Sequence, residues 1–241
     1  MMGDKKALQA GTSHYLGQNF SKAFDVKYQD ADNKEKFVYA TSWGVSTRLL
    51  GALIMVHGDD KGLRLPPNIA PIQLVIIPIY KSEQDCQKIK QYIEPIISDC
   101  KNKNITYYFD NRDKVSPGFK FNEWEMKGVP LRIEVGMRDV KNKEIVMARR
   151  DTSTKSSYKH NNIILKIESE LNNIQNKLFE EALHFRNANT HLVDNYENFK
   201  KIINNEGGFI QCFWDGKTKT EESIKKETNA TIRCILDSNN I

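Results

Sequence analysis

The stretch "IQLVIIPIYKSEQDCQKIKQYIEPIISDC", residues 72–100, decides the fold class of this chain. Its first part, residues 72–80, is a continuous apolar run of strand length, which predicts a strand buried on both faces. Ser82 begins a predicted helix whose apolar residues recur every three or four positions: Cys86, Ile89, Ile93, Ile96 or Ile97, and Cys100. Both cysteines fall on this stripe, so we expect them to pack in the core.

Three more predicted strands follow this strand and helix. They are "ITYYFD" (105–110), "LRIEVG" (131–136) and "EIVMARRD" (144–151), and the last two are separated by a charged turn, "MRDVKNK" (137–143). A strand, a helix and then further strands predict a small α/β domain with a mixed sheet, which we place at residues 71–160.

The pattern becomes helical after about residue 161. One predicted helix carries the stripe Ile167, Leu171, Ile174, Leu178, Ala182 and Phe185, and a second carries Leu192, Tyr196, Phe199 and Ile203. A strand "FIQCFW" (209–214), a helix "TEESIKKET" (220–228) and a strand "ATIRCIL" (230–236) complete the pattern. Residues 161–241 are therefore predicted to form a small α+β domain.

Upstream of the α/β domain, residues 1–70 are predicted to hold strands and one helix. "EKFVYATSW" (35–43) alternates like a strand, and "VSTRLLGALIMVH" (45–57) is apolar at helical spacing. Gly58 and Gly62 follow the helix, and Pro66 and Pro67 indicate a domain boundary.

The 241 residues carry a formal net charge of +5. This charge is compatible with a polyanionic partner, and a lysine- and asparagine-rich surface explains it equally well. No apolar run approaches the roughly 18–20 residues that span a bilayer, and the first residues lack the apolar segment of a signal peptide. We therefore expect a cytoplasmic protein without a membrane segment.

Polar residues gather at two places in the first 50 residues. Arg48 follows Ser46 at the predicted strand-to-helix junction, where a guanidinium can hold a phosphate, stack on a base, or simply lie at the start of a helix. Gln9, Thr12 and His14 surround a glycine, an arrangement that suits either a small polar ligand or an ordinary turn.

Taken together, long segments of the chain resemble the prolyl-tRNA synthetase family of class II aminoacyl-tRNA synthetases. "QAGTSHYLGQNFSKAFDV" (9–26) and "GVSTRLLGALIMVHGD" (44–59) resemble the end of its catalytic domain, the second segment being similar to motif 3. "PGFKFNEWEMKGVPLRIEVGMRD" (117–139) and "MARRDTSTK" (147–155) resemble its anticodon-binding domain. "CFWDGKTKTEESIKKETNATIRCI" (212–235) is similar to the extra C-terminal domain of the archaeal/eukaryote-like type.

The resemblance implies a proline–tRNA ligase, which forms prolyl-adenylate from proline and ATP and transfers the prolyl group to tRNA(Pro). Residues 1–70 then represent part of a class II antiparallel β catalytic core. Arg48 takes the place of the catalytic motif 3 arginine that holds ATP, and Ser46, Gln9 and Thr12 also face ATP, with Gln9 near the phosphates that bind Mg²⁺. His14 lines the proline pocket.

For residues 71–160 the resemblance implies binding of the tRNA(Pro) anticodon. Unpaired bases are recognised by stacking and by hydrogen bonds to their edges, while Lys and Arg hold phosphates. A carboxylate such as Glu125 can accept hydrogen bonds from guanine, and Trp124 is either a stacking platform or a core residue. The expected anticodon-binding residues are Pro117, Lys120, Glu125, Arg132, Arg149 and Arg150.

Zinc is not expected, although the family's extra domain often holds it through four cysteines. Only Cys212 and Cys234 lie in residues 161–241, Thr220 stands where another ligand is expected, and His184 and His191 have an unhelpful spacing. We expect no metal site and predict that both cysteines pack in the core.

Motif 3 stands at residue 44 because motifs 1 and 2 are absent, as is the upstream proline-contacting segment. We therefore expect a C-terminal fragment that does not form prolyl-adenylate by itself, of an enzyme whose full-length relatives are homodimers. Two alternatives stay open. Residues 71–160 could serve as a free-standing tRNA anticodon-binding module without catalysis, or the chain could be a structural remnant or interaction protein without a ligand.

Overall fold

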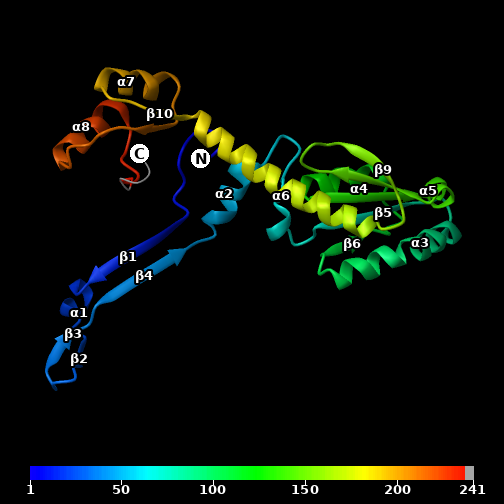
Figure 1. The fold of residues 1–241 in the computed structure, drawn as a ribbon, viewed down its shortest axis with the longest axis horizontal. Helices are drawn as coiled ribbons and strands as arrows, with labels where there is room; N and C mark the ends of the chain where they lie inside the picture. Colours follow the sequence, from blue (N-terminus) through cyan, green and yellow to red (C-terminus); the bar gives the residue numbers. More distant parts are fainter. Residues whose placement is uncertain (237–241) are drawn as a thin grey trace. The chain divides into compact units, whose positions relative to one another are not determined.

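The computed structural model describes residues 1–236 (Figure 1). They form two compact units, one made of residues 8–181 and the other of residues 1–7 together with the residues from 182 onward. Among the described residues, no helix combines the length and the apolar character needed to cross a bilayer.

A five-stranded sheet is the centre of the larger unit. Its strands are β5 (Leu74–Ile79), β6 (Tyr107–Phe109), β7 (Leu131–Gly136), β8 (Glu144–Arg149) and β9 (Lys155–Lys159), in the order β6-β5-β7-β8-β9. Strand β5 runs parallel to both β6 and β7, whereas β7, β8 and β9 pair antiparallel. The predicted mixed sheet is confirmed.

Helix α3 (Glu83–Asn102) begins directly after Ser82, the predicted start, which is its N-cap. The Ser82 Oγ accepts a hydrogen bond from the backbone N–H of Asp85 at 3.2 Å, an N-cap that satisfies one of the first free amides. The predicted stripe is buried over its whole length, including Cys86 and Cys100. Core packing of these two cysteines is therefore confirmed.

Replacing Ser82 by alanine removes this cap, and we expect it to lower the free energy of unfolding by about 1 kcal/mol. Ser98→Ala, which changes an exposed serine inside the same helix, is the matched control. Urea unfolding followed by circular dichroism measures both variants. If Ser82→Ala lowers the free energy of unfolding no more than Ser98→Ala does, the cap contributes nothing to stability.

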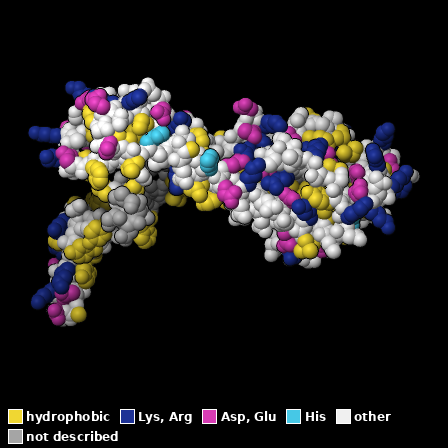
Figure 2. Space-filling view, turned by 45° about the horizontal axis from the view of Figure 1, so that its top comes forward, with side chains coloured by type: hydrophobic (Ala, Val, Ile, Leu, Met, Phe, Trp, Pro, Cys, Tyr) yellow, Lys and Arg dark blue, Asp and Glu magenta, His cyan; other side chains and the backbone are white. Residues whose placement is uncertain are grey.

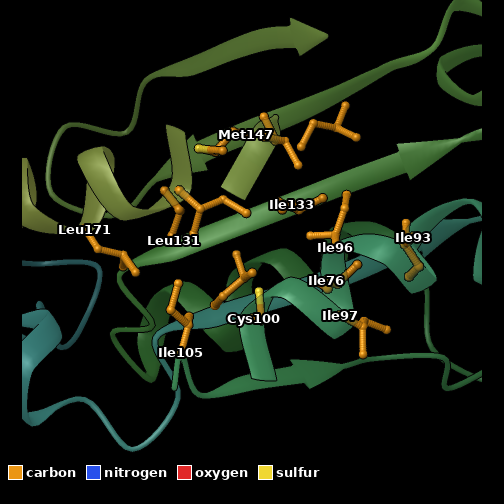
Figure 3. Close-up of a cluster of buried hydrophobic side chains, with 14 of the residues drawn as sticks. Ile76, Ile93, Ile96, Ile97, Cys100, Ile105, Leu131, Ile133, Met147 and Leu171 are labelled. Atoms are coloured by element: carbon orange, nitrogen blue, oxygen red, sulfur yellow. The ribbon is translucent and has the colours of Figure 1, made fainter. Parts of the chain in front are cut away.

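The main core lies between one face of the sheet and two helices, α3 and α6 (Ile163–Ala188). The cluster in Figure 3 includes Ile93, Ile96, Ile97 and Cys100 of α3, Ile76, Leu131, Ile133 and Met147 of the sheet, and Leu171 of α6. The α6 stripe from Ile167 to Leu178 is buried in this cluster. The helix after residue 162 thus shares the core of the sheet, and the compact units divide after residue 181.

The opposite face of the sheet carries α4 (Pro117–Met126). Val75 and Ile77 of β5 pack there against Trp124 and Val129, whereas Leu74 and Ile76 face the main core. Strands β6 and β7 flank β5 on opposite sides, so two crossovers of the usual right-handed kind place α3 and α4 on opposite faces. Burial on both faces explains why residues 74–79 are a continuous apolar run.

The predicted turn between β7 and β8 is wrong, because residues Met137–Asn142 form the short helix α5. The Asp139 carboxylate accepts the backbone N–H of Gly136 at 2.7 Å and so stabilises the first turn. Lys143 ends the helix in the left-handed conformation, with φ of 54°.

Residues 11–57 form two antiparallel pairs of strands and two helices. Strands β1 (Gly11–Gly17) and β4 (Ala40–Val45) pair antiparallel, as do β2 (Lys27–Gln29) and β3 (Glu35–Phe37), and the short helix α1 (Asn19–Ala23) follows β1. The single strand predicted over 35–43 is split into β3 and β4. The first part pairs with β2 and the second with β1, and the change of partner falls after Phe37. Helix α2 (Arg48–His57) confirms the predicted helix, and a 3₁₀ turn, η1 (Pro67–Ile69), follows the prolines.

The smaller unit contains two short parallel strands, β10 (Thr190–Leu192) and β11 (Phe209–Gln211), and the helices α7 (Tyr196–Asn205) and α8 (Thr218–Thr228). Leu192 was predicted on the helix. It lies instead in β10 with 79% of its surface exposed, because Asn195 caps the helix three residues later.

Two further expectations for this unit are wrong. Cys212 and Cys234 are exposed, so they do not pack in a core. Residues 230–236 form no strand in the described structure, since β10 and β11 pair only with each other. The apolar residues of "ATIRCIL" predict a strand from local pattern alone, but within the described residues no neighbouring strand edge pairs with this segment. Residues 237–241, at the end of the predicted domain 161–241, lie outside the described residues.

Candidate nucleic-acid interface

Helix α4 presents one face to the sheet and the other to solvent. Pro117 occupies its first turn, where a missing N–H costs nothing, and the Ser116 Oγ accepts the Phe119 N–H at 3.3 Å. Trp124 and Lys120 face inward and are buried, whereas Pro117 and Phe119 are exposed. Among the predicted anticodon residues, Pro117 is thus on the surface of the helix and Lys120 is not.

The inner face of α4 is held by a buried carboxylate, Asp110, which follows β6 and is fully inaccessible to solvent. Asp110 accepts hydrogen bonds from Arg112 Nε at 2.9 Å and from Trp124 Nε1 at 2.8 Å. The Lys120 ammonium donates to the Asp110 backbone carbonyl at 3.0 Å and lies 3.7 Å from its carboxylate. Trp124, left open by the sequence, is therefore a core residue here.

Burial alone raises the pKa of Asp110, but the hydrogen bonds from Arg112 and Trp124 outweigh it and hold the pKa at about 2. The carboxylate is thus ionised at neutral pH and serves as the counter-ion of Lys120, which is only 2% exposed. A contact between Lys120 and a tRNA phosphate, which stays a prediction, requires the ammonium to leave this partner.

The outer part of the same sheet face carries four interacting charges, which we call the charge quartet: Glu125, Arg132, Glu134 and Lys155. The Arg132 guanidinium donates to Glu125 through Nη1 and to Glu134 through Nε, each at 2.9 Å. Lys155 Nζ lies 2.7 Å from the carboxylate of Glu134. Sheet register explains the grouping, because Arg132 and Lys155 both lie opposite Ala148 on β8.

Phe121 of α4 lies above the quartet. Its ring centre is 4.5 Å from the Arg132 guanidinium and 4.9 Å from Lys155 Nζ, within the range of cation–π attraction. Glu125 keeps about a third of its side-chain surface exposed, and Lys155 about half. The quartet therefore offers a carboxylate and an ammonium to solvent beside an aromatic ring.

Sequence reasoning missed Phe121 and Glu134 as members of this group. The signal for Glu134 was present, since Arg132 and Glu134 are two residues apart on a predicted strand and must share one face. On β9 the same two-residue spacing places Lys155, Ser157 and Lys159 on one face, all exposed. On the face of the molecule drawn in Figure 2, Lys and Arg side chains are interspersed with Asp and Glu.

The two remaining predicted arginines pair with carboxylates outside the quartet. Arg149 donates to Asp151 at 2.9 Å through Nε and to Glu170 of α6 at 2.6 Å, so it faces the helix on the main-core side. Arg150 is buried and pairs with Asp59. The structure thus pairs Glu125 with Arg132, whereas the carboxylate partners of Arg149 and Arg150 lie outside the quartet. Arg150 also contacts the main chain of Glu125. Their roles in tRNA binding stay predictions.

Three of the predicted ATP-binding residues meet at the start of α2. Arg48 Nη1 donates to the side-chain oxygen of Gln9 at 3.2 Å, and the Arg48 backbone N–H donates to Ser46 Oγ at 3.3 Å. All three side chains are exposed.

Thr12 and His14 lie on one face of β1, opposite Gly44 and Ser42 of β4. Neither has a hydrogen bond to Arg48 among the contacts within residues 1–236. No three His, Cys, Asp or Glu side chains are grouped to hold a metal ion in that part of the chain.

Comparison with known proteins places these features in one family. The family model described as "Anticodon binding domain" matches residues 73–170, and the model described as "Prolyl-tRNA synthetase, C-terminal" matches residues 196–240. The first match covers the whole sheet and the start of α6, in agreement with the shared core.

Curated relatives and a solved structure agree with these models. The chain is 54% identical to the proline–tRNA ligase of Flavobacterium psychrophilum and 52% identical to that of Cytophaga hutchinsonii, each over 98% of this chain and 48% of the relative. It therefore spans about half the length of the curated relatives it matches.

The crystal structure of prolyl-tRNA synthetase from Cryptosporidium parvum in complex with L-proline and AMP superposes with a TM-score of 0.85 at 37% identity. The superposition covers 93% of this chain and 48% of that one. Two family models, relatives at about half identity and a shared fold lead to one conclusion: the chain belongs to the prolyl-tRNA synthetase family and represents its C-terminal part.

Proposed function

We propose that this chain is the tRNA-recognising part of a cytoplasmic proline–tRNA ligase. The complete enzyme activates proline with ATP and Mg²⁺ to prolyl-adenylate and transfers the prolyl group to tRNA(Pro). In this proposal residues 71–160 bind the anticodon, the C-terminal domain lies within residues 161–241, and residues 1–70 belong to the catalytic domain. The observation that carries the proposal is the charge quartet beside the exposed face of α4.

The quartet has the chemistry that recognition of unpaired bases needs. The Glu125 carboxylate is an acceptor for a guanine N–H pair, and the Arg132 guanidinium supplies donors 2.9 Å away from it. Lys155, which is half exposed, is placed to hold a phosphate. Pro117 lies on the exposed part of the same helix, where a base can stack against it.

For the catalytic part, the proposal assigns ATP to Gln9, Thr12, Ser46 and Arg48, and proline to His14. Adenylate formation depends on positioning the reactants and neutralising phosphate charge, so an exposed guanidinium and Mg²⁺ suffice without a protein nucleophile. Arg48 and Gln9, joined at 3.2 Å, are suitably placed for this. In this proposal the complete enzyme is a homodimer, like the full-length family members.

A second candidate function is anticodon binding without catalysis. The observation in its favour is that the sheet, α3, α4 and α6 have a core of their own, built from side chains between residues 74 and 178. Aminoacylation of tRNA(Pro) by the chain, with and without a separately supplied catalytic half, distinguishes the two functions.

The first test is binding of the chain to a tRNA(Pro) transcript and to the same transcript with both anticodon guanines replaced. We expect the replacement to weaken binding about tenfold or more, which corresponds to roughly 1.4 kcal/mol. Both affinities are measured at two salt concentrations by filter binding, because phosphate contacts alone give binding that is salt-sensitive and blind to sequence.

Glu125→Gln provides the side-chain control, since it keeps the size of the residue and removes the charge that accepts from guanine. It should remove the preference for the natural anticodon and leave the affinity for the substituted transcript unchanged. Equal binding of the two transcripts by the unaltered chain would contradict the proposal.

A further inference from the structure

Residues 58–65, which we call the strap, run from the end of α2 along the C-terminal end of α4. The Leu63 N–H donates to the Met126 carbonyl at 3.0 Å, and the Leu65 N–H donates to the Gly128 carbonyl at 3.2 Å. A Cβ on Gly62 would lie 2.6 Å from the Met126 carbonyl oxygen, and a Cβ on Gly128 would lie 2.6 Å from Leu63. Both glycines also have positive φ, so the close approach of strap and helix requires them.

One arginine fixes the strap to the helix end. The two terminal nitrogens of Arg150 donate to the two carboxylate oxygens of Asp59, one of them at 2.8 Å, in a bidentate pair. Arg150 Nε donates to the backbone carbonyl of Glu125 at 2.8 Å. The Arg150 side chain is only 3% exposed, and every nitrogen of its guanidinium has a partner.

This geometry opposes a phosphate contact by Arg150. The Arg150 guanidinium is buried, whereas the Asp59 side chain is 37% exposed. A phosphate could reach the guanidinium only after displacing Asp59 from the bidentate pair, which would leave the Asp59 charge without its counter-ion. Hydrogen bonds from Arg150 also hold the pKa of Asp59 at about 2, so the carboxylate is charged at neutral pH. All hydrogen bonds of the Arg150 guanidinium go to other parts of the protein: to Asp59 of the strap and to the main chain of the quartet residue Glu125.

We propose that Asp59 and Arg150 form a clamp that holds Glu125 in place for anticodon recognition. Arg150 is then a positioning residue that touches no part of the tRNA. The inference rests on the proposed function, because it assigns to the clamp the placement of a residue that reads the anticodon. Since the strap continues from Gly58 at the end of α2, the clamp also joins the helix that carries Arg48 to the helix that carries Glu125.

The test compares Arg150→Gln and Asp59→Asn in the complete chain, using the two transcripts described above over a series of salt concentrations. We expect both variants to weaken binding of the natural transcript about tenfold. Binding of the transcript without anticodon guanines, and the dependence of log affinity on log salt, should stay unchanged. Arg138→Gln, which removes one positive charge from an exposed position, is the matched control.

A direct phosphate contact by Arg150 gives the opposite pattern. Arg150→Gln would then weaken both transcripts alike and lower the salt dependence by about 1, and Asp59→Asn would leave binding unchanged or strengthen it. Either result overturns the clamp. If the unaltered chain does not distinguish the transcripts, the proposed function fails and the clamp with it. If the unaltered chain distinguishes the two transcripts and both variants distinguish them equally well, the proposed function stands and only the clamp fails.

Hydrogen exchange separates a local effect from loss of the fold. In both variants the amides of Leu63 and Leu65 should exchange faster, while the amides of β5 and β7 stay protected. If Arg150→Gln unfolds the sheet, Asp59→Asn carries the test, because it preserves shape and removes only the charge. Unchanged guanine preference in a folded Asp59→Asn chain contradicts the clamp.

Discussion

Replacing Asp110 by alanine is expected to lower the free energy of unfolding of the larger unit by about 3–5 kcal/mol. The carboxylate is fully buried and compensates the buried ammonium of Lys120, 3.7 Å away. Without it the Lys120 charge stays in the interior with only a carbonyl partner, and the Trp124 N–H loses its acceptor at 2.8 Å. Removing one partner of a buried pair is therefore much more harmful than removing a surface charge.

Urea unfolding followed by the fluorescence of Trp124 measures this loss, because the indole itself donates to Asp110. The other two tryptophans, Trp43 and Trp214, are first replaced by phenylalanine so that the signal comes from one site. Asp113→Ala, an exposed aspartate three residues further on, is the control and should change stability by less than about 0.5 kcal/mol. A loss below about 1 kcal/mol at Asp110 would contradict the assigned role.

The same carboxylate predicts a dependence of stability on pH. Its pKa is about 2 in the folded chain and about 3.9 in an unfolded one, so it binds protons more weakly when folded. Its contribution is complete above about pH 4 and is lost as the pH falls toward 2. The difference in stability between the parent chain and Asp110→Asn should therefore shrink over that interval.

Replacing Ile174 by alanine is expected to destabilise the larger unit by about 2–5 kcal/mol. Ile174 lies on α6, beyond the boundary predicted after residue 160, yet it is buried in the same cluster as Ile133 of β7. The substitution leaves a cavity between helix and sheet. Leu165→Ala on the same helix, where the side chain is 61% exposed, is the matched control and should cost less than about 1 kcal/mol.

The fluorescence of Trp124 reports this effect as well, since it lies on the opposite face of the sheet from α6. If the residues after 160 fold independently of the sheet, Ile174→Ala will leave the unfolding midpoint of Trp124 unchanged. A shifted midpoint shows that α6 is part of the anticodon-binding fold.

The elements that could be predicted from the sequence are those whose apolar pattern is local. Residues 74–79 are apolar throughout, and the α3 stripe from Cys86 to Cys100 repeats at helical spacing, so both elements and their buried faces follow from the pattern alone. Residues 230–236 have a similar strand-like pattern and form no strand. A strand also needs an edge to pair with, and the position of edges depends on contacts far apart in the sequence.

The candidate site was predictable in its residue types and less so in its contacts. Lys120 and Arg132 stand in one short segment. A basic side chain that is free to bind a phosphate and one that is already paired with a carboxylate are the same residue types in the sequence. Only the fold distinguishes them, because Asp110 reaches Lys120 from the end of β6, whereas Glu125 of α4 reaches Arg132 of β7. The resemblance to the family located the segment, and it did not indicate which charges are already paired.

The charge quartet has one more consequence. It contains two cations and two anions, so Glu125 is already occupied by a guanidinium before any base arrives. In the proposed function, binding of a base edge to Glu125 is therefore an exchange reaction, in which the base replaces the hydrogen bond from Arg132. A hydrogen bond to a charged group contributes about 1.5–3 kcal/mol. The Arg132–Glu125 bond thus sets an energetic threshold for binding at Glu125. A group with two well-placed donors can displace Arg132, whereas a group with one donor or none leaves Arg132 bound to Glu125.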